Sequence, residues 1–388
     1  MQKLINNKLI IIFGILFFLI PALLFAFNIQ NWDDSIEKTE KETFGVETYA
    51  DGFDIPWGMA FLPNKNLIVS DRNGNLWKIN YSNQKKTQIS GVPNVRYRGQ
   101  GGLLDVQIHP DFINNNYIYI GFTDYLKKKK KKTFTSIIRA TLKNKNLTNH
   151  KIIYKANDKY YSNRTIHYGT RIVFDKEGYL YFSIGDRGNR DQAQLLNTPN
   201  GKIHRLNDDG SIPKDNPFIK NDNAIKSIWT YGNRNPQGLA IHPTSLIIFE
   251  TEHGPKGGDE LNILSSGNNY GWPEITYGKN YSGTTITKHT HKKGMEQPVI
   301  HWTPSIAVCG IDFYDGKLFK NWENNLLVTS LKFENLYRLE IKNNKVFDQE
   351  LVYQAGSRIR DVETGPDGYI YLALEEPGRI IRFIPVKN

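Results

Sequence analysis

The sequence predicts an all-β fold, a six-bladed β-propeller, and three observations lead to this prediction. A pattern of two apolar–polar alternations, joined by a turn with Asn, Asp or Gly, returns six times, and such alternation is typical of β-hairpins. Successive repeats begin 47, 66, 67, 72 and 51 residues apart, which suits a four-stranded blade of about 40–50 residues plus loops. No long amphipathic helical pattern follows residue 45. Repeats of this period in an all-β chain predict a propeller.

The repeats divide the body of the chain into six units. They occupy Gly58–Ile79, Asp105–Tyr125, Arg171–Gly188, Gly238–Pro255, Gly310–Ile341 and Asp361–Ile384. A two-sheet sandwich, the main structural alternative, would not explain the repeated turn followed by a Tyr-rich alternation. In a propeller, loops from several blades meet at the mouth of the central channel. Polar residues far apart in sequence are therefore expected to form one site there.

Residues 1–27 differ from the rest of the chain. Lys3 and Lys8 precede the apolar run Leu9–Phe27, and a basic start before an apolar core predicts an export signal. The run is also about long enough to span a bilayer, so an uncleaved membrane anchor is the alternative. Residues 28–44 are polar and are interpreted as a linker, and residues 45–388 as the propeller domain. The protein is therefore expected to be exported and periplasmic, either free or tethered.

Charge and cysteine content narrow the possible functions. The formal net charge is +11, but Lys3, Lys8 and the run Lys127–Lys132 supply eight of the positive charges. Nucleic-acid binding, which needs basic residues spread over a face, is therefore not expected. The run is interpreted as a solvated insertion, with contact to anionic lipid or polysaccharide as the alternative. Cys309 is the single cysteine, so no disulfide within the chain is possible.

The segment Glu252–Pro273 is a candidate functional loop. It begins E-H-G-P-K-G-G-D-E and follows an apolar run. The Gly254-Pro255 step can leave carbonyl oxygens free of any strand ladder. Together with the carboxylates of Asp259 and Glu260, they are the hard oxygen ligands that Ca²⁺ prefers. The alternative is an ordinary Gly-rich turn with two solvated acids.

Two histidines are candidate general bases, because imidazole titrates near neutral pH. His109 lies within a hairpin turn, whereas His167 ends a loop directly before the third repeat. A purely structural role is the alternative for each of them. The position of His167 at a blade entry favours it as the base.

Cationic and amide side chains precede or follow several repeats. Arg234-Asn235 stands before the fourth repeat, and Gln100 stands among glycines before the second. Lys332 ends a strand of the fifth repeat. Arg358 and Arg360 are two residues apart, so they share one face of a strand. Converging at one mouth, these side chains would bind a polyanionic ligand; separate surface salt bridges and a flexible glycine turn are the alternatives.

Nine of these segments, in order over about residues 50–385, resemble the soluble pyrroloquinoline-quinone (PQQ)-dependent glucose and aldose-sugar dehydrogenases. The matching segments are GQGGLLDV, HYGTRIVF, YLYFSIGDRG, GKIHRLNDDGSIPKDNPF, YGNRNPQGLA, EHGPKGGDELN, GNNYGWP, LLVTSLK and RIRDV. The family is a six-bladed propeller. Its members oxidise aldoses at the anomeric carbon to lactones and pass electrons to an external acceptor, a quinone or a cytochrome.

The resemblance also implies roles for individual residues. His167 would be the catalytic base, and Arg234 would stabilise the developing oxyanion. The expected PQQ-binding residues are Gln100, Arg234, Asn235, Lys332, Arg358 and Arg360. The carbonyls of Gly254 and Pro255 would bind the Ca²⁺ that sits on the quinone. Glu260 and Tyr270 would bind a second, structural Ca²⁺, with Asp259 close by.

The chain departs from the glucose-specific branch of the family at three positions. The residue before the base is Ile166 rather than Asp, Asn233 replaces a His, and Asp191 replaces a cofactor-contacting Gln. These changes and the shorter chain favour the broader aldose-sugar branch. Two other functions remain as alternatives: a calcium-dependent propeller hydrolase resembling a lactonase, and a non-catalytic propeller binding module. The hydrolase would not need the cations Lys332, Arg358 and Arg360, which suit a tricarboxylate cofactor better than a neutral lactone. The binding module would be free to lose His167 and the Gly254-Pro255 step, yet both are present.

Overall fold

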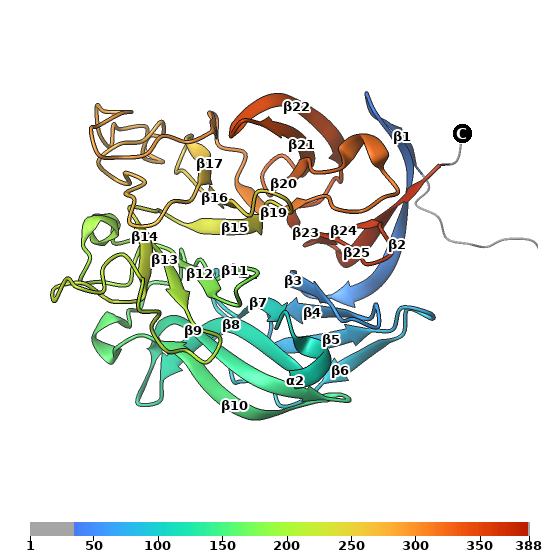
Figure 1. The fold of residues 1–388 in the computed structure, drawn as a ribbon, viewed down its shortest axis with the longest axis horizontal. Helices are drawn as coiled ribbons and strands as arrows, with labels where there is room; N and C mark the ends of the chain where they lie inside the picture. The colour runs from blue at the N-terminus through green and yellow to red at the C-terminus, as the bar shows by residue number, and fades with distance from the viewer. Residues whose placement is uncertain (1–34, 387–388) are drawn as a thin grey trace, which may run out of the picture. The chain divides into compact units, whose positions relative to one another are not determined.

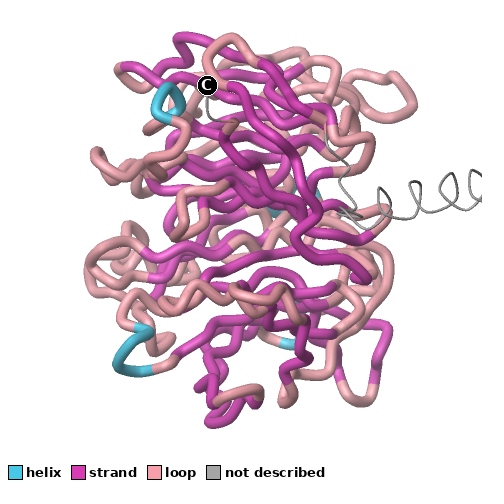
Figure 2. Tube along the Cα trace, turned by 90° about the vertical axis from the view of Figure 1, so that its right-hand side faces the viewer, coloured by secondary structure: helices cyan, strands magenta, loops and turns pink. Residues whose placement is uncertain are grey.

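The computed structural model describes residues 35–386, in which six antiparallel sheets surround a central channel (Figure 1). The six-bladed β-propeller expected from the sequence is confirmed. The expected export signal or anchor, residues 1–27, lies outside the described residues. Strands dominate the fold and the helical segments are short (Figure 2). Among residues 35–386, no helix is long and apolar enough to cross a membrane.

The first three blades follow the chain in order, each running outward from the channel. Blade one contains β3 (Pro56–Phe61), β4 (Leu67–Asp71), β5 (Asn75–Ile79) and β6 (Lys86–Ile89). Blade two contains β7 (Leu103–Ile108), β8 (Tyr117–Leu126), β9 (Lys129–Lys143) and β10 (Asn146–Lys155). Blade three contains β11 (Ile172–Phe174), β12 (Leu180–Ile184), β13 (Lys202–Leu206) and β14 (Ile228–Tyr231).

The last three blades complete the ring. Blade four contains β15 (Pro236–Ile241), β16 (Ile248–Glu252), β17 (Asp259–Ile263) and β18 (Ile300–Trp302). Blade five contains β19 (Val308–Phe313), β20 (Leu326–Ser330), β21 (Asn335–Lys342) and β22 (Lys345–Gln354). Blade six contains β23 (Ile359–Thr364), β24 (Ile370–Leu374), β25 (Gly378–Pro385), β2 (Thr43–Phe53) and β1 (Ile36–Lys38). The short helices are α2 (Phe112–Asn115), η1 (Asp158–Tyr160), η2 (Arg190–Gln194) and η3 (Lys320–Trp322).

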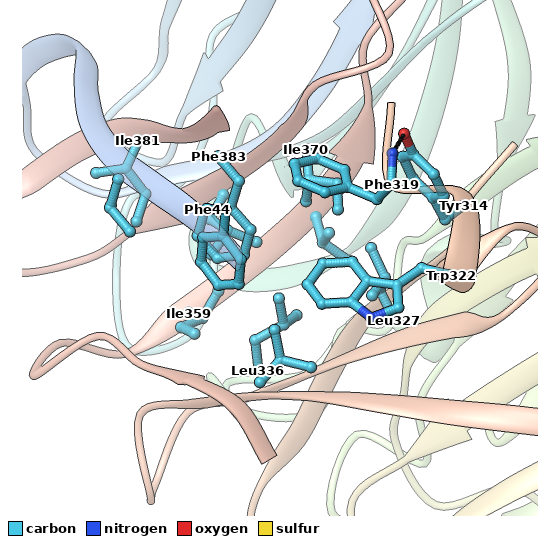
Figure 3. Packing of buried hydrophobic residues seen from close by; sticks show 14 of the residues in the cluster. Phe44, Tyr314, Phe319, Trp322, Leu327, Leu336, Ile359, Ile370, Ile381 and Phe383 are labelled. Carbon is cyan, nitrogen blue, oxygen red and sulfur yellow. Dashed lines mark hydrogen bonds between the residues drawn. The ribbon is translucent and has the colours of Figure 1, made fainter. Parts of the chain in front are cut away.

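Blade six joins the two ends of the described chain, because β2 pairs with the C-terminal β25. Phe44 is fully buried and stacks on Phe383 at a centroid distance of 4.2 Å. Its ring also packs against Trp322 of the neighbouring blade (Figure 3). Residues 36–38 and 43–44 therefore belong to the propeller and not to the expected linker. The polar composition of this segment reflects an edge strand with one exposed face; residues 28–34 lie outside the described part.

The strand next to the channel strand is largely buried on both faces in each blade. In β24 and in β12 every residue is buried, because each blade packs against a blade on either side. In the outer strand β22, by contrast, exposed residues alternate with half-buried or buried ones over most of its length. Burial on both faces explains the short continuous apolar runs in the sequence.

Each of the six repeats begins with a residue beside the channel. Three of these first residues, Asp105, Arg171 and Asp361, form a buried ion cluster that we name the axial clasp. Arg171 Nη1 lies 3.1 Å from Asp105 Oδ1 and 2.8 Å from Asp361 Oδ1. A Cβ atom at Gly58 would lie 2.4 Å from the Asp105 carboxylate, and one at Gly310 would lie 2.5 Å from that of Asp361. Gly58 in blade one and Gly310 in blade five thus leave room for the carboxylates of Asp105 and Asp361.

Candidate active site

The loop before β11 holds His167 in a strained backbone conformation. Its φ angle is +53°, a left-handed value that non-glycine residues seldom adopt. The Gln100 side-chain oxygen accepts a hydrogen bond from the His167 backbone N–H at 2.7 Å. Gln100 comes from the glycine-rich segment before blade two, so two blades fix this histidine. Strain of this kind collects at functional sites.

Asp186, which follows β12, orients the imidazole of His167. Its Oδ1 lies 2.6 Å from His167 Nδ1. The same carboxylate accepts hydrogen bonds from the Gly188 N–H at 2.6 Å and from the Trp272 indole N–H at 2.9 Å. An ionised carboxylate only accepts, so the Nδ1 of His167 carries the proton and Nε2 has a free lone pair. Asp186 lies in one of the segments that resemble the family, YLYFSIGDRG, but the sequence alone indicated no role for this residue.

The pKa shifts of His167 and Asp186 suit a role of His167 as a general base. Burial lowers the pKa of His167, and the hydrogen bond to Asp186 opposes this only in part. Burial alone would raise the pKa of Asp186, but the hydrogen bond and charge of His167 and the charge of Arg234 lower it. The pair at neutral pH is therefore a neutral imidazole beside an ionised carboxylate.

Arg234 lies beside this pair, two residues before the start of β15. Its Nη1 donates to the carbonyls of His253 at 2.8 Å and Gly254 at 3.1 Å. The guanidinium also lies 5.3 Å from the centre of the Trp272 ring. Trp272 therefore contacts both the arginine and the carboxylate that orients His167, a role that sequence reasoning missed.

A cavity of about 80 Å³ lies where the blade entries converge. Four of the predicted cofactor-binding residues line it: Gln100, Asn235, Arg358 and Arg360. The remaining lining residues are Trp57, Arg72, Leu104, Tyr168, Gly169, Gln237, His253 and Leu331. Asn235 Oδ1 accepts from the Gly169 N–H at 3.3 Å, which ties the cavity wall to the loop of His167.

Glu375 lies between the two arginines of blade six. Its carboxylate is 2.8 Å from Arg360 Nε and 2.7 Å from Arg358 Nε. Glu375 and Arg360 are buried, whereas the Arg358 side chain is 46% exposed. One carboxylate thus fixes both guanidinium groups but neutralises only one of their charges. Its position just after β24 was not singled out from the sequence.

Two further side chains of the cavity have buried nitrogen atoms without a partner in the described part of the chain. These are Arg72 Nε and His253 Nε2. Burial and then the charge of Arg234 lower the pKa of His253 well below its usual value, so it is a neutral ring. Buried polar atoms without partners are uncommon, and here they line a cavity that a polar ligand can enter. Sequence reasoning missed Arg72, whose signal was its position just after β4.

Lys332 follows β20 but does not line this cavity. It is exposed, and its ammonium lies 5.2 Å from the centre of the neighbouring Phe333 ring. The preceding residue, Leu331, does line the cavity. Contact between Lys332 and a ligand would therefore require the flexible lysine side chain to turn towards the cavity.

The Gly254-Pro255 turn is built around Asp259. The Asp259 carboxylate accepts from the Gly254 N–H at 2.8 Å and from the Ser305 hydroxyl at 2.8 and 2.9 Å. It also accepts from the Val308 N–H at 3.1 Å. A Cβ atom at Gly254 would lie 2.1 Å from the Gly257 carbonyl, so only glycine fits there. The Asp259 carboxylate, already engaged by three groups, holds the turn in place.

A second, much smaller cavity of about 10 Å³ lies beyond this turn. Glu252, Gly254, Glu260 and Tyr270 are among its lining residues. Burial and the charge of Glu252 raise the pKa of Glu260 well above its usual range. The Tyr270 hydroxyl already donates to the Ile263 carbonyl at 2.6 Å. Within residues 35–386, no group of three or more His, Cys, Asp or Glu side chains is arranged to hold a metal ion.

Comparison with known proteins agrees with this geometry. A family model described as Glucose / Sorbosone dehydrogenase matches residues 53–382. The chain belongs to the glucose/sorbosone dehydrogenase family. This confirms the resemblance stated from the sequence and places the protein among sugar-oxidising oxidoreductases.

Two relatives show how far the similarity extends. The chain is 40% identical to the aldose sugar dehydrogenase YliI of Escherichia coli over 348 residues, which is 88% of this chain and 93% of the relative. It is 28% identical to quinoprotein glucose dehydrogenase B of Acinetobacter calcoaceticus, over 89% and 92% of the two chains. The similarity therefore spans the whole propeller.

Solved structures show the same arrangement. The apo-form of the soluble aldose sugar dehydrogenase from Escherichia coli superposes with a TM-score of 0.84 at 38% identity, over 89% of this chain and 100% of that chain. The PQQ-bound aldose sugar dehydrogenase from Streptomyces coelicolor gives a TM-score of 0.72 at 25% identity, over 89% and 99% of the chains.

Proposed function

We propose that the protein oxidises aldose sugars at the anomeric carbon to lactones, with PQQ and Ca²⁺ as cofactors. Electrons would pass to an external acceptor, a quinone or a cytochrome. The observation that carries the proposal is the pair of His167 and Asp186 beside an arginine-lined cavity, in a chain of this family. Sequence similarity to a PQQ-bound aldose sugar dehydrogenase supports the choice of cofactor.

The residues around the cavity fit a tricarboxylate quinone. Arg72, Arg358 and Arg360 bring three positive charges, and Glu375 offsets one of them. The unpartnered Nε of Arg72 offers a buried donor to a ligand oxygen. Planar guanidinium groups pair with carboxylates through two parallel hydrogen bonds. When bound, the quinone accepts the hydride from the sugar, and the Ca²⁺ beside it acts as a Lewis acid.

The chain's own residues supply the proton transfer. His167 Nε2 would take the proton of the anomeric hydroxyl, while the carboxylate of Asp186 keeps Nδ1 protonated and stabilises the imidazolium that forms. Arg234 would stabilise negative charge that develops beside His167, because its guanidinium is buried there and held by two carbonyls.

Calcium would have to rely mainly on carbonyl oxygens. The turn at Gly254-Pro255, which Asp259 holds in place, would present carbonyls to an ion beside the quinone. The Gly254 carbonyl accepts from Arg234 Nη1, so it would offer the ion its second lone pair. The small cavity between Glu260 and Tyr270 has the volume of about one water molecule or ion. Glu260 would supply a carboxylate there and Tyr270 its carbonyl, since the hydroxyl is already bonded.

The proposed site of action is the periplasm. A basic start before an apolar run supports export to the periplasm, with the segment either removed or kept as a tether to the membrane. Both forms would present the propeller to sugars outside the cytoplasm.

The test is a titration of the apo-protein with PQQ in the presence of Ca²⁺, followed by absorbance and by dye reduction with an aldose. Saturable binding and aldose-dependent dye reduction are expected. His167→Ala should bind the quinone and lose turnover, whereas His109→Ala should keep it. A hydrolase or a binding module would show no quinone dependence, and absence of saturable quinone binding would refute the proposal.

A further inference from the structure

A groove lined by lysines opens beside the β8–β9 hairpin. It has a volume of about 750 Å³. Six lysines line it: Lys127, Lys128, Lys129, Lys132, Lys155 and Lys159. The other lining residues are Asn94, Asp124, Tyr125, Leu126 and Asp158. We call this surface the lysine groove.

The lysine groove is more than a solvated run of like charges. Lys155 and Lys159 come from the end of β10 and from η1, so two separate segments face the same hollow as the hairpin. Only two acids line it, and Asp124 is already engaged, by Lys155 at 3.1 Å and by the Tyr161 hydroxyl at 2.6 Å. A net positive charge therefore remains, and a concave basic surface concentrates anionic ligands.

Close to its turn, the same hairpin contacts the active-site loop. Thr133, the residue after Lys132, pairs with Ser162, with its N–H 2.8 Å from the Ser162 carbonyl. The Thr133 hydroxyl lies 2.7 Å from the Tyr168 hydroxyl. Tyr168 directly follows His167 and lines the cofactor cavity. The last lysine of the run, Lys132, is therefore next in sequence to a residue that contacts the loop of His167.

A second contact joins the hairpin to the orienting carboxylate. Arg187, which follows Asp186, donates from Nη2 to the Thr133 hydroxyl at 3.3 Å and to the Arg164 carbonyl at 2.6 Å. Its guanidinium also lies 3.5 Å from the centre of the Tyr168 ring. Because Arg187 is fully buried, these contacts fix the hairpin relative to the pair of His167 and Asp186.

We propose that the lysine groove binds the negatively charged units of an acidic oligosaccharide whose reducing end is oxidised at His167. This inference rests on the proposed function and names a substrate class for it, uronate-containing aldose oligosaccharides. Several carboxylates on one sugar chain can pair with the several lysines that line one groove. Tyr125 adds an aromatic ring on which a sugar can pack. Electrostatic attraction of this kind raises association rates by about 10–10³-fold and falls with salt.

The test compares two matched triple variants. K127Q/K128Q/K129Q removes three exposed lysines from the groove, and K65Q/K320Q/K345Q removes three exposed lysines from outside it. Binding of trigalacturonic acid to quinone-free protein is measured by calorimetry at about 0.01 M salt, where the Debye length is about 30 Å, and again at about 1 M. Binding at low salt that the groove variant weakens at least about tenfold, and the control variant leaves intact, is expected.

Kinetics of the loaded protein give the second readout. The measured quantity is the ratio of kcat/KM for trigalacturonic acid to kcat/KM for the neutral trisaccharide maltotriose. The groove variant should lower this ratio at least about tenfold at low salt, and the control variant should not.

The failures of the two proposals are distinguishable. If no aldose is oxidised, the proposed function fails, while calorimetry without quinone still tests the groove. Equal binding and equal kinetic ratios in both variants would overturn the inference. So would groove-dependent binding to anionic phospholipid vesicles without binding of trigalacturonic acid, which would assign the surface to a membrane.

Discussion

Replacing Asp186 by Asn removes one negative charge and almost no volume from the pair that prepares His167. In the wild-type protein Oδ1 accepts from His167 Nδ1 and from the Gly188 N–H, and Oδ2 accepts from the Trp272 indole. An amide has one acceptor and one donor end. In either orientation its NH₂ group therefore faces at least one N–H donor, so two donors are placed opposite each other and that hydrogen bond is lost.

The two orientations of the amide have different consequences for the histidine. With the NH₂ group towards His167, Nδ1 must become the acceptor, and the proton moves to Nε2, where it blocks the base. With the NH₂ group towards Trp272, the buried indole donor loses its partner, at about 1–3 kcal/mol of folding free energy. In both cases the imidazolium loses its counter-charge.

We expect Asp186→Asn to lower kcat by about 10²–10⁴, the usual contribution of a positioned base. At 1.36 kcal/mol per factor of ten, this equals about 3–5 kcal/mol of barrier. The assay is dye reduction with an aldose at saturating PQQ and Ca²⁺, with quinone binding measured separately by absorbance. Asp222→Asn, at a fully exposed carboxylate, is the control. A kcat within about threefold of wild type, with quinone bound, would refute the role assigned to Asp186.

Four further predictions concern other parts of the molecule. Because burial lowers the pKa of His167, turnover should rise with pH through a value below 6.5 and stay level above it; an acid limb above pH 7 would contradict this. Arg360→Ala leaves Glu375 less compensated and removes a cofactor partner, so quinone affinity in an absorbance titration should fall at least about a hundredfold, a loss near 3 kcal/mol. Arg171→Met leaves the two acids of the axial clasp unpaired and should cost about 3–5 kcal/mol in urea unfolding at pH 7. Burial raises the pKa of Asp105 to about 7 and also raises the pKa of Asp361, so the cost should shrink at pH 5, where Asp105 is protonated and needs no counter-charge; an equal cost at both pH values would refute this. Chelation should lower the melting temperature, since an ion bound only by the folded state stabilises it, and Glu260→Gln should reduce that effect; a melting temperature indifferent to chelator would count against the structural ion.

Local sequence patterns were enough to predict the class of fold and to single out several residues that the structure brings together. Period-two alternation with turn residues depends on neighbours along the chain, so the six blades can be counted from the order of residues alone. Short motifs at blade entries also brought out Gln100, Asn235, Arg358 and Arg360, all of which line one cavity. These residues stand just outside strand ends, where a propeller brings loops together.

The pairings between blades, in contrast, arise only in the folded chain. The junction of β2 with β25 depends on the closure of the ring, which no local pattern encodes. The partnership of Glu375 with two arginines and that of Asp186 with His167 and Trp272 join residues that are distant in sequence or fall on separate strands. A lone acidic residue after a strand is indistinguishable from a solvated side chain until its neighbours in space are known. Burial and partner geometry, the two quantities that set its charge and its role, are fixed only when the blades pack.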